Sequence, residues 1–317
     1  RYEAFTSFFT YDSNAIEGNS LTLDETSFLL FENIVPSSKS LREINETLNH
    51  KKAFDYMLNY KEDITKDFIL KLHKFVVDNT LRKELESQIG IYRKVQVYIR
   101  GRDWIPPKPS EVSNEIKSLL AWYSKNKKNT HPLIIASYFH IAFETIHPFL
   151  DGNGRIGRLL ITLYLVSEKI LEKPLLYLSA FFEKNKSLYY DNLTRVREKN
   201  DLLHWLKYFL VGIAQTSEQA VETLSTILKL KERLETDITK NWGRRSSQAL
   251  ILLQYLFEEP IVAVKQVEDI CKLSKKAANE LVNEFERSGI LMEISGKTRY
   301  RVFVFREYLN LFKKDLP

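Results

Sequence analysis

The chain has 317 residues, of which 44% are hydrophobic and 28% are charged, so it is long enough for a large core or for two domains. Its net charge of +6 permits contact with nucleic acid without demanding it, and its single cysteine, Cys271, excludes an internal disulfide and favours a reducing compartment. No apolar run of membrane-spanning length is free of charge and no signal-peptide pattern is present, so we expect a cytoplasmic protein without membrane contact.

The N-terminal segment 2–20 is predicted to form a short amphipathic helix that ends at Gly18-Asn19, a common helix stop. Ser13 and Glu17 are four residues apart, so they would share one face of this helix. Taken alone, this pattern is typical of a surface helix whose polar side chains are solvated.

Further helices are predicted through residue 126, because apolar residues recur at helical spacing and Ser or Thr residues stand at their starts. Thr22 and Glu25 form a capping box before one of them, and Thr65 caps another. The predicted ranges are 22–33, 41–60, 65–76 and 110–126.

Residues 90–107 differ in character from these helices. Val95, Val97 and Ile99 alternate with polar or aromatic residues, which is the period of a β-strand. A turn at 101–103 separates this arm from a second one, so the segment is predicted to be a β-hairpin.

A helix, a short loop and a second helix follow in the centre of the chain. Residues 133–146 are apolar almost without interruption, and Pro148 ends that helix because proline cannot donate within it. Asp151 to Gly154 form a tight polar loop. The apolar pattern resumes at Arg155 and continues to about residue 166, which predicts a second buried helix.

This loop has the chemistry of an anion site. The first amides of a helix have no internal partner and lie at the positive end of its dipole. Gly152 and Gly154 allow a phosphate to approach the backbone closely. Arg155 and Arg158 are three residues apart, so both project to similar sides of the first turn and can bind phosphate oxygens in bidentate fashion.

Two further residues add reactive chemistry at the same place. Asp151 offers a hard oxygen ligand of the kind that Mg²⁺ uses when it also holds substrate phosphates. His147, with an ordinary pKa near ~6.5, is suited to taking a proton from a hydroxyl. The segment therefore predicts a site for a nucleoside triphosphate and a hydroxyl nucleophile.

Two helices fit residues 177–210, with a break near 199–201, and a long helix is expected at 211–240. Tyr189 and Tyr190 could stack on a purine, because an aromatic plane suits any base. The same spacing is also typical of core residues, so both interpretations stay open.

The C-terminal segment 245–317 is predicted to be a winged helix-turn-helix domain, with three helices and a hairpin wing. Basic and amide side chains that could contact DNA are Lys275, Lys276, Asn279, Asn283, Arg287, Lys297, Arg299 and Arg301. Glutamates on the third helix cancel its positive charge, which makes that helix a poor partner for phosphates. DNA binding and protein or dimer contact therefore remain equal alternatives.

The twelve residues HPFLDGNGRIGR, 147–158, match every defined position of the motif HxFx(D/E)GNGRxxR, and the chain here resembles Fic-domain proteins. The resemblance implies a mainly α fold, a helical bundle with a β-hairpin flap, that transfers AMP from ATP to a Tyr, Thr or Ser hydroxyl of a target protein or of itself. The roles that it implies are general base for His147, Mg²⁺ ligand for Asp151, phosphate cradle for Gly152, Asn153 and Gly154, triphosphate contact for Arg155 and γ-phosphate contact for Arg158.

The resemblance extends to the segment SNAIEG, 13–18, which is similar to the family's inhibitory motif (S/T)xxxE(G/N) in the class with an N-terminal inhibitory helix. Glu17 would pair with Arg158 and occupy the space that the γ-phosphate needs, so that ATP binds with its α-phosphate poorly aimed. Ser13 is the first residue of this motif and belongs to the same inhibitory segment.

Two other segments take a role from the resemblance. The hairpin is similar to the family's flap, so an extended segment of a target protein would pair beside it, and we expect docking at Val97, Tyr98 and Ile99. Tyr190, and less strongly Tyr189, would contact adenine. The family also allows a homodimer that controls the inhibitory helix.

The predicted organisation is an N-terminal helical region at 1–60, a catalytic core at 61–212, a connecting helix at 213–244 and the winged-helix domain at 245–317. Two alternatives to AMP transfer remain. The same site could remove AMP from a protein, because both reactions need the same four residues, Glu17, His147, Asp151 and Arg158. The chain could also be a DNA-binding regulator that acts through 245–317.

Overall fold

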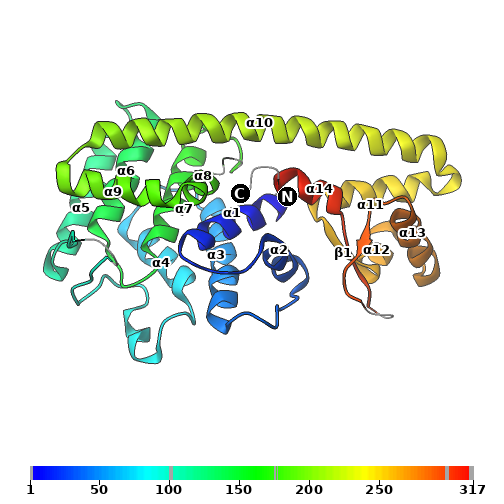
Figure 1. The fold of residues 1–317 in the computed structure, drawn as a ribbon, viewed down its shortest axis with the longest axis horizontal. Coiled ribbons are helices and arrows are strands. Elements are labelled where there is room, and N and C mark those ends of the chain that lie inside the picture. The colour runs from blue at the N-terminus through cyan, green and yellow to red at the C-terminus, as the bar shows by residue number, and fades with distance from the viewer. Residues whose placement is uncertain (1–2, 100–102, 175, 177, 297–299, 314–317) are drawn as a thin grey trace. The chain divides into compact units, whose positions relative to one another are not determined.

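A computed structural model describes residues 3–99, 103–174, 176, 178–296 and 300–313. This part of the chain is mainly helical, and its strands are short and lie near the C-terminus (Figure 1). The fold class is therefore mainly α, as the sequence predicts.

The first four helices are α1 (Glu3–Ile16), α2 (Leu23–Glu32), α3 (Leu41–Asn59) and α4 (Lys66–Val77), followed by a short 3₁₀ helix at Lys83–Gln88. Their starts carry the capping residues that the sequence predicts. The Thr22 hydroxyl accepts from the Glu25 N–H at 3.1 Å while the Glu25 carboxylate accepts from the Thr22 N–H at 2.7 Å. The Thr65 hydroxyl accepts from the Phe68 N–H at 3.2 Å.

The central helices are α5 (Pro109–Asn126), α6 (Pro132–Ile146) and α7 (Asn153–Ser167). α6 and α7 pack against each other, and α3 and α4 pack against α7. Nearly every residue of α7 is buried, including Arg155 and Arg158, because other helices pack around it. The loop between α6 and α7 is thus fixed at both ends by the core.

The structure differs from the β-hairpin predicted at 90–107. Residues 90–99 and 103–107 contain no assigned strand, and residues 100–102, which include most of the expected turn, lie outside the described residues. Side chains connect the two arms instead of a ladder. The Gln96 amide donates to the Pro106 carbonyl at 3.0 Å, and the Arg93 guanidinium donates to the Pro107 carbonyl. Alternation in one arm could not reveal this, because pairing depends on both arms.

Helices α8 (Leu178–Lys184) and α9 (Lys186–Lys199) follow, and α9 ends at Asn200 in a left-handed conformation. The predicted break near 199–201 is therefore present. The expected second break near 210 is absent, because α10 (Leu202–Asn241) is one helix of 40 residues. Gly212 lies within it, where a side chain would collide with Phe181.

The remaining elements are a 3₁₀ turn at Gly243–Arg245, α11 (Ser246–Glu258), β1 (Ile261–Ala263), α12 (Val264–Cys271), α13 (Lys275–Arg287), β2 (Met292–Glu293), β3 (Val302–Val304) and α14 (Arg306–Lys313). The strands form one antiparallel sheet in the order β1-β3-β2, with Ile261 and Met292 both opposite Val304. The sequence predicts the two hairpin arms, but not β1 or α14.

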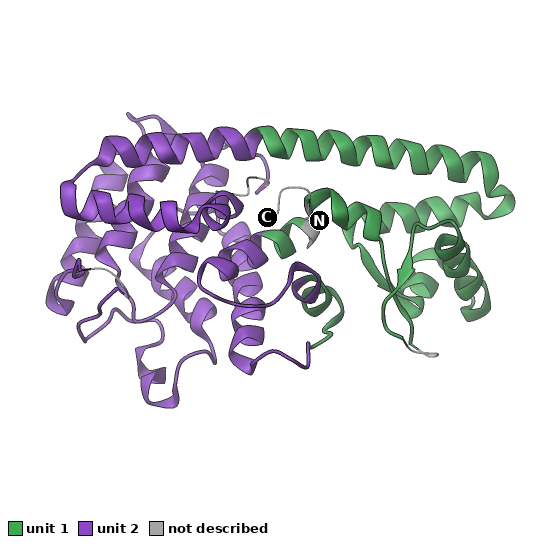
Figure 2. Ribbon diagram, viewed as in Figure 1, with its two compact units in different colours: residues 1–8, 27–35, 218–317 green, residues 9–26, 36–217 purple. Residues whose placement is uncertain are grey.

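The chain divides into two compact units whose boundaries differ from the predicted ones (Figure 2). One unit contains residues 1–8, 27–35 and 218–317, and the other contains 9–26 and 36–217. Residues of the predicted region 1–60 occur in both units, and α1, α2 and α10 each contribute to both. Within the described part of the chain, we find no helix with the length and hydropathy needed to cross a bilayer.

Candidate active site

The loop between α6 and α7 begins and ends in left-handed backbone. His147 caps the C-terminus of α6 with φ 49°, and Gly152 caps the N-terminus of α7 with φ 82°. Gly152 also lies against Val76 and Val77 of α4, so a larger residue would be strained and crowded. The loop thereby turns the chain sharply enough to present the first amides of α7 beside His147.

Side chains hold this loop in shape. The Asn153 amide is buried and makes two 2.9 Å hydrogen bonds to the backbone of Phe149, one as donor and one as acceptor. Its side chain therefore closes the loop. Arg93, also buried, donates to the carbonyl of His147 at 2.8 Å. Sequence reasoning missed Arg93, because no local motif marks it.

His147 opens onto a cavity of about 570 Å³. Residues that also line this cavity are Glu17, Tyr98, Ile99, Glu144, Gly154, Arg158, Lys186, Tyr190 and Arg197. Burial lowers the pKa of His147 to about 4, and the nearby Arg197 adds to this effect. The imidazole is thus neutral at pH 7, and its Nδ1 has no hydrogen-bond partner among the described residues. A neutral, unpartnered imidazole in a cavity can accept a proton.

Glu144 lies one helical turn before His147 and lines the same cavity. Its carboxyl is buried, and burial raises its pKa to about 7 although Arg158 and Arg197 oppose the shift. Glu144 is a second site residue that sequence reasoning missed. The only available signal was an acidic residue within an otherwise apolar helix.

The N-terminal segment reaches this cavity through Arg158. The buried Arg158 guanidinium donates to the Glu17 carboxylate at 2.7 Å, to the Ser13 carbonyl at 2.8 Å and to the Ser13 hydroxyl at 3.1 Å. Burial alone would lower the pKa of Arg158, but the Glu17 carboxylate holds it above its ordinary value. The structure thus brings together Ser13, Glu17 and Arg158. Glu17 and Arg158 are 141 positions apart in the sequence.

Glu17 lies directly over the start of α7. A methyl group placed on Gly154 would collide with its Oε1 atom and with the Arg158 guanidinium. The carboxylate therefore occupies the N-terminal end of this helix, where a phosphate oxygen would otherwise accept from the backbone. Gly18, with φ 93°, ends α1 so that Glu17 can turn toward this position.

The two expected adenine residues have different surroundings. Tyr189 is buried, and its hydroxyl bonds the His140 Nε2 atom at 2.9 Å. Tyr190 is partly exposed and donates to the Ile16 carbonyl at 3.3 Å, while Lys186 donates to the Ala15 carbonyl at the same distance. Tyr189 and Tyr190 both line the cavity, and Tyr190 and Lys186 also hold the end of α1.

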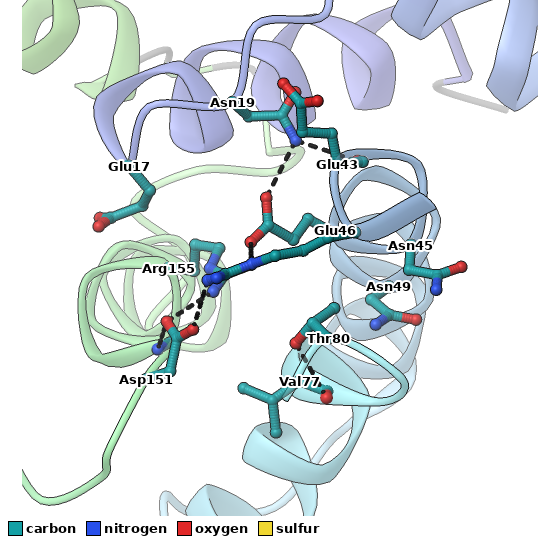
Figure 3. Close-up of polar contacts among 12 residues, drawn as sticks. Glu17, Asn19, Glu43, Asn45, Glu46, Asn49, Val77, Thr80, Asp151 and Arg155 are labelled. Carbon is teal, nitrogen blue, oxygen red and sulfur yellow. Dashed lines mark hydrogen bonds and ion pairs between the residues drawn. The ribbon is translucent and has the colours of Figure 1, made fainter. Parts of the chain in front are cut away.

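Asp151 lies at the other end of the loop, with both carboxylate oxygens engaged (Figure 3). Oδ1 accepts from the Arg155 guanidinium at 2.9 Å, and Oδ2 accepts from the Arg42 guanidinium at 2.9 Å. Burial alone would raise the pKa of Asp151, but these two arginines hold it below its ordinary value. An ionised carboxylate beside a helix N-terminus suits a Mg²⁺ ion whose other ligands are waters and phosphates. Among the described residues we find no cluster of three or more His, Cys, Asp or Glu side chains that could hold a metal ion.

The expected docking residues lie on the exposed arm of the 90–107 segment. Tyr98 is 73% exposed, and Tyr98 and Ile99 line the cavity, whereas Val97 does not. Two of the three expected docking residues therefore line the same cavity as His147.

The sequence was compared with those of known proteins. Residues 63–165 match the Fic/DOC family. Over 161 residues the chain is 35% identical to the protein adenylyltransferase Fic of Nematostella vectensis, covering 49% of this chain and 36% of that protein. Over 252 residues it is 29% identical to the protein adenylyltransferase Fic of Drosophila melanogaster, covering 75% of this chain and 49% of that protein. The chain therefore carries a Fic domain and is homologous to these proteins, of which it spans less than half.

Solved structures share the fold. A Fic family protein from Desulfovibrio desulfuricans G20 superimposes with a TM-score of 0.63 at 22% identity, covering 95% of this chain and 86% of that one. The Fic-1 protein of C. elegans superimposes with a TM-score of 0.59 at 28% identity, covering 69% of this chain and 63% of that one. The first likeness extends beyond the Fic domain to most of the chain.

Proposed function

We propose that this chain, which carries a Fic domain, is a protein adenylyltransferase that transfers AMP from ATP to a hydroxyl side chain and is held inactive by Glu17. One observation carries the proposal. The Glu17 carboxylate pairs with Arg158 over the N-terminus of α7, in the cavity that His147 lines. An anion of the protein thus stands where the site is built to accept an anion of the substrate.

We assign the steps of the proposed transfer to side chains around the cavity and the loop. With Glu17 withdrawn, the first amides of α7 and Arg158 bind the triphosphate. His147 takes the proton of the target hydroxyl, the hydroxyl oxygen attacks the α-phosphorus, and pyrophosphate leaves. Asp151 would hold Mg²⁺, which would neutralise phosphate charge. The Fic relatives that match this chain are named adenylyltransferases, which supports ATP as the donor.

The inhibition is electrostatic and steric together. Arg158 has one guanidinium, and the carboxylate of Glu17 and a γ-phosphate would compete for it. Ser13 strengthens the inhibited state, because its hydroxyl and carbonyl take two further donors of the same guanidinium. Withdrawal of α1 would therefore release Arg158 completely.

Removal of AMP is the second candidate function. Glu17 and His147 line one cavity, and a carboxylate there could orient a water for attack on a bound AMP ester. Under this alternative, Glu17 is required for activity, which reverses the expected effect of its removal.

We further propose a winged-helix domain at 245–317. The order α11, β1, α12, α13, β2, β3 and the antiparallel sheet support it. Arg301 bonds the side chains of Asn279 and Asn283 at 3.2 and 3.0 Å, and Arg245 pairs with Glu280 of α13 at 2.7 Å. These internal contacts favour a protein partner over DNA, because they occupy groups that would read bases.

The test is transfer of label from α-labelled ATP onto protein, with Mg²⁺, in a lysate and with the purified chain. We expect strong labelling by Glu17→Gly, weak labelling by the wild type and none by Glu17→Gly with His147→Ala. If Glu17→Gly transferred no label to any protein, in the lysate or alone, the proposal would be contradicted. Release of AMP from a labelled protein by the wild type, lost in Glu17→Gly, would establish the second candidate.

A further inference from the structure

Four charged side chains form a closed ring beside the α6–α7 loop. Arg42 and Glu46 come from α3, and Asp151 and Arg155 come from the loop and the start of α7. Arg42 contacts Glu46 at 3.0 Å and Asp151 at 2.9 Å, while Arg155 contacts Asp151 at 2.9 Å and Glu46 at 3.6 Å. Figure 3 shows Glu46, Asp151 and Arg155 converging on this point. Two positive and two negative charges alternate, so the ring is neutral.

The two arginines of the ring are held very differently. The side chain of Arg155 is 2% exposed, so it cannot leave without a large rearrangement. The side chain of Arg42 is 59% exposed, and a solvated ion pair contributes little to stability. Arg42 is therefore the one cation of this ring that can move away at low cost.

We propose that, in the protein without nucleotide, Arg42 takes the place of a divalent cation at Asp151, so that a metal ion binds there only by displacing this guanidinium. The inference rests on the proposed role of Asp151 as the metal ligand. It makes Arg42 a positioning residue that holds the Asp151 carboxylate in place until a metal ion arrives.

Charge explains why the displacement is needed. A divalent ion added to the intact ring would meet a neutral group whose Asp151 oxygens already accept from two guanidinium groups. When Arg42 leaves, the three remaining charges are Glu46, Asp151 and Arg155, a net charge of −1 with one free oxygen on Asp151. That arrangement attracts a cation strongly at short range.

The experiment measures Mn²⁺ binding to the full chain without nucleotide, from the electron paramagnetic resonance signal of the free ion. Arg42→Gln removes the charge and keeps a polar side chain of similar length. We expect it to bind Mn²⁺ at least about ten-fold more tightly than the wild type at low ionic strength, because a nearby positive charge has gone. The gain should shrink as salt is added, as expected for an exposed charge.

Two matched variants make the result specific. Arg195→Gln breaks another exposed ion pair, in which Arg195 and Asp201 lie 2.6 Å apart and Asp201 is 29% exposed, close to the 28% of Asp151. This variant should bind Mn²⁺ as the wild type does. Adding Asp151→Asn to Arg42→Gln should abolish the gain. A gain that survives Asp151→Asn, an equal gain in Arg195→Gln, or equal affinity of Arg42→Gln and the wild type would each overturn the proposal.

Because the readout needs neither ATP nor AMP transfer, it separates this inference from the proposed function. A chain that transfers AMP but shows no gain in Arg42→Gln would refute only the role of Arg42. A chain that shows the gain but transfers no AMP would refute only the proposed reaction.

Discussion

At the scale of single residues, burial shifts the pKa values of two side chains in the cavity, His147 and Glu144, in opposite directions. Burial lowers the pKa of His147 to about 4 and raises that of Glu144 to about 7, because in each case the charged form loses its hydration. At pH 7 the site therefore holds a neutral imidazole and a carboxyl that is about half ionised. Both residues change charge at a pH unlike that of the free side chain.

The low pKa of His147 predicts the acid limb of the reaction. A general base works only when it is unprotonated. The rate of AMP transfer by Glu17→Gly should therefore stay constant down to about pH 5, where His147 is still neutral, and fall as the pH approaches 4. Rates measured between pH 4 and 8 test this, with far-ultraviolet circular dichroism as a control for acid unfolding. An acid limb near pH 6.5, the ordinary value for histidine, would contradict it.

The raised pKa of Glu144 predicts a pH-dependent stability. Between about pH 4.5 and 7 the unfolded state has lost this proton while the folded state retains it, so the stability contributed by Glu144 falls as pH rises. Relative to Glu144→Gln, the wild type should lose roughly 3 kcal/mol of unfolding free energy between pH 4.5 and 8. Denaturant melts of both proteins at these two pH values measure the difference, which would stay constant if Glu144 had an ordinary pKa.

At the scale of elements, the end of α1 is fastened to α3 as well as to Arg158. The Asn19 amide donates to the Glu46 carboxylate at 3.1 Å and to the Glu43 carbonyl at 3.0 Å, and its oxygen accepts from the Leu21 N–H (Figure 3). Glu46 is also a member of the charge ring around Asp151. The segment around Glu17 is therefore connected to α7 directly, at Arg158, and through Glu46, at Arg155.

Loss of these hydrogen bonds should loosen the segment that carries Ser13 and Glu17. Asn19→Ala removes three hydrogen bonds, so we expect a loss of about 1–3 kcal/mol in unfolding free energy and faster amide exchange at residues 13–19. Hydrogen exchange by mass spectrometry checks this. Asn59→Ala is the matched control, since it removes one exposed bond to the Asp55 carbonyl at the end of α3. Equal exchange of residues 13–19 in both variants would show that Asn19 does not hold the segment.

At the scale of the whole molecule, the unit that contains 218–317 also includes the first turns of α1. The Phe8 ring stacks on Phe312 of α14 at 4.5 Å, and the Phe5 ring meets it edge-on at 5.1 Å. One continuous helix thus begins among the C-terminal elements and ends one residue before Glu17. The part of α1 that follows Phe8 therefore leads directly from these ring contacts to Glu17.

Phe312→Ala should therefore affect the start of α1. The ring is 6% exposed, so its removal should lower the unfolding free energy of this unit by about 3 kcal/mol and speed amide exchange in residues 5–8. Tyr300→Ala is the control, because Tyr300 is 88% exposed. Unchanged exchange at 5–8 in Phe312→Ala would mean that the aromatic contacts do not order the helix.

The sequence by itself determined the local features of this protein. The helices, their caps and the loop from His147 to Arg158 follow from apolar spacing, from Thr22 and Thr65 and from the glycines, all of which act within a few residues. The pairing of Glu17 with Arg158 was accessible only through resemblance to a motif, because nothing local links two residues so far apart.

The tertiary structure decided everything that depends on distant contacts. Arg42 meets Asp151 across 109 positions, and Arg93 meets the His147 carbonyl across 54, so neither role could be found from spacing. The prediction of a hairpin at 90–107 was wrong for the same reason, because strand pairing depends on both arms. Local sequence fixes backbone preferences, whereas packing decides which side chains meet, and those meetings set the charges and pKa values of the site.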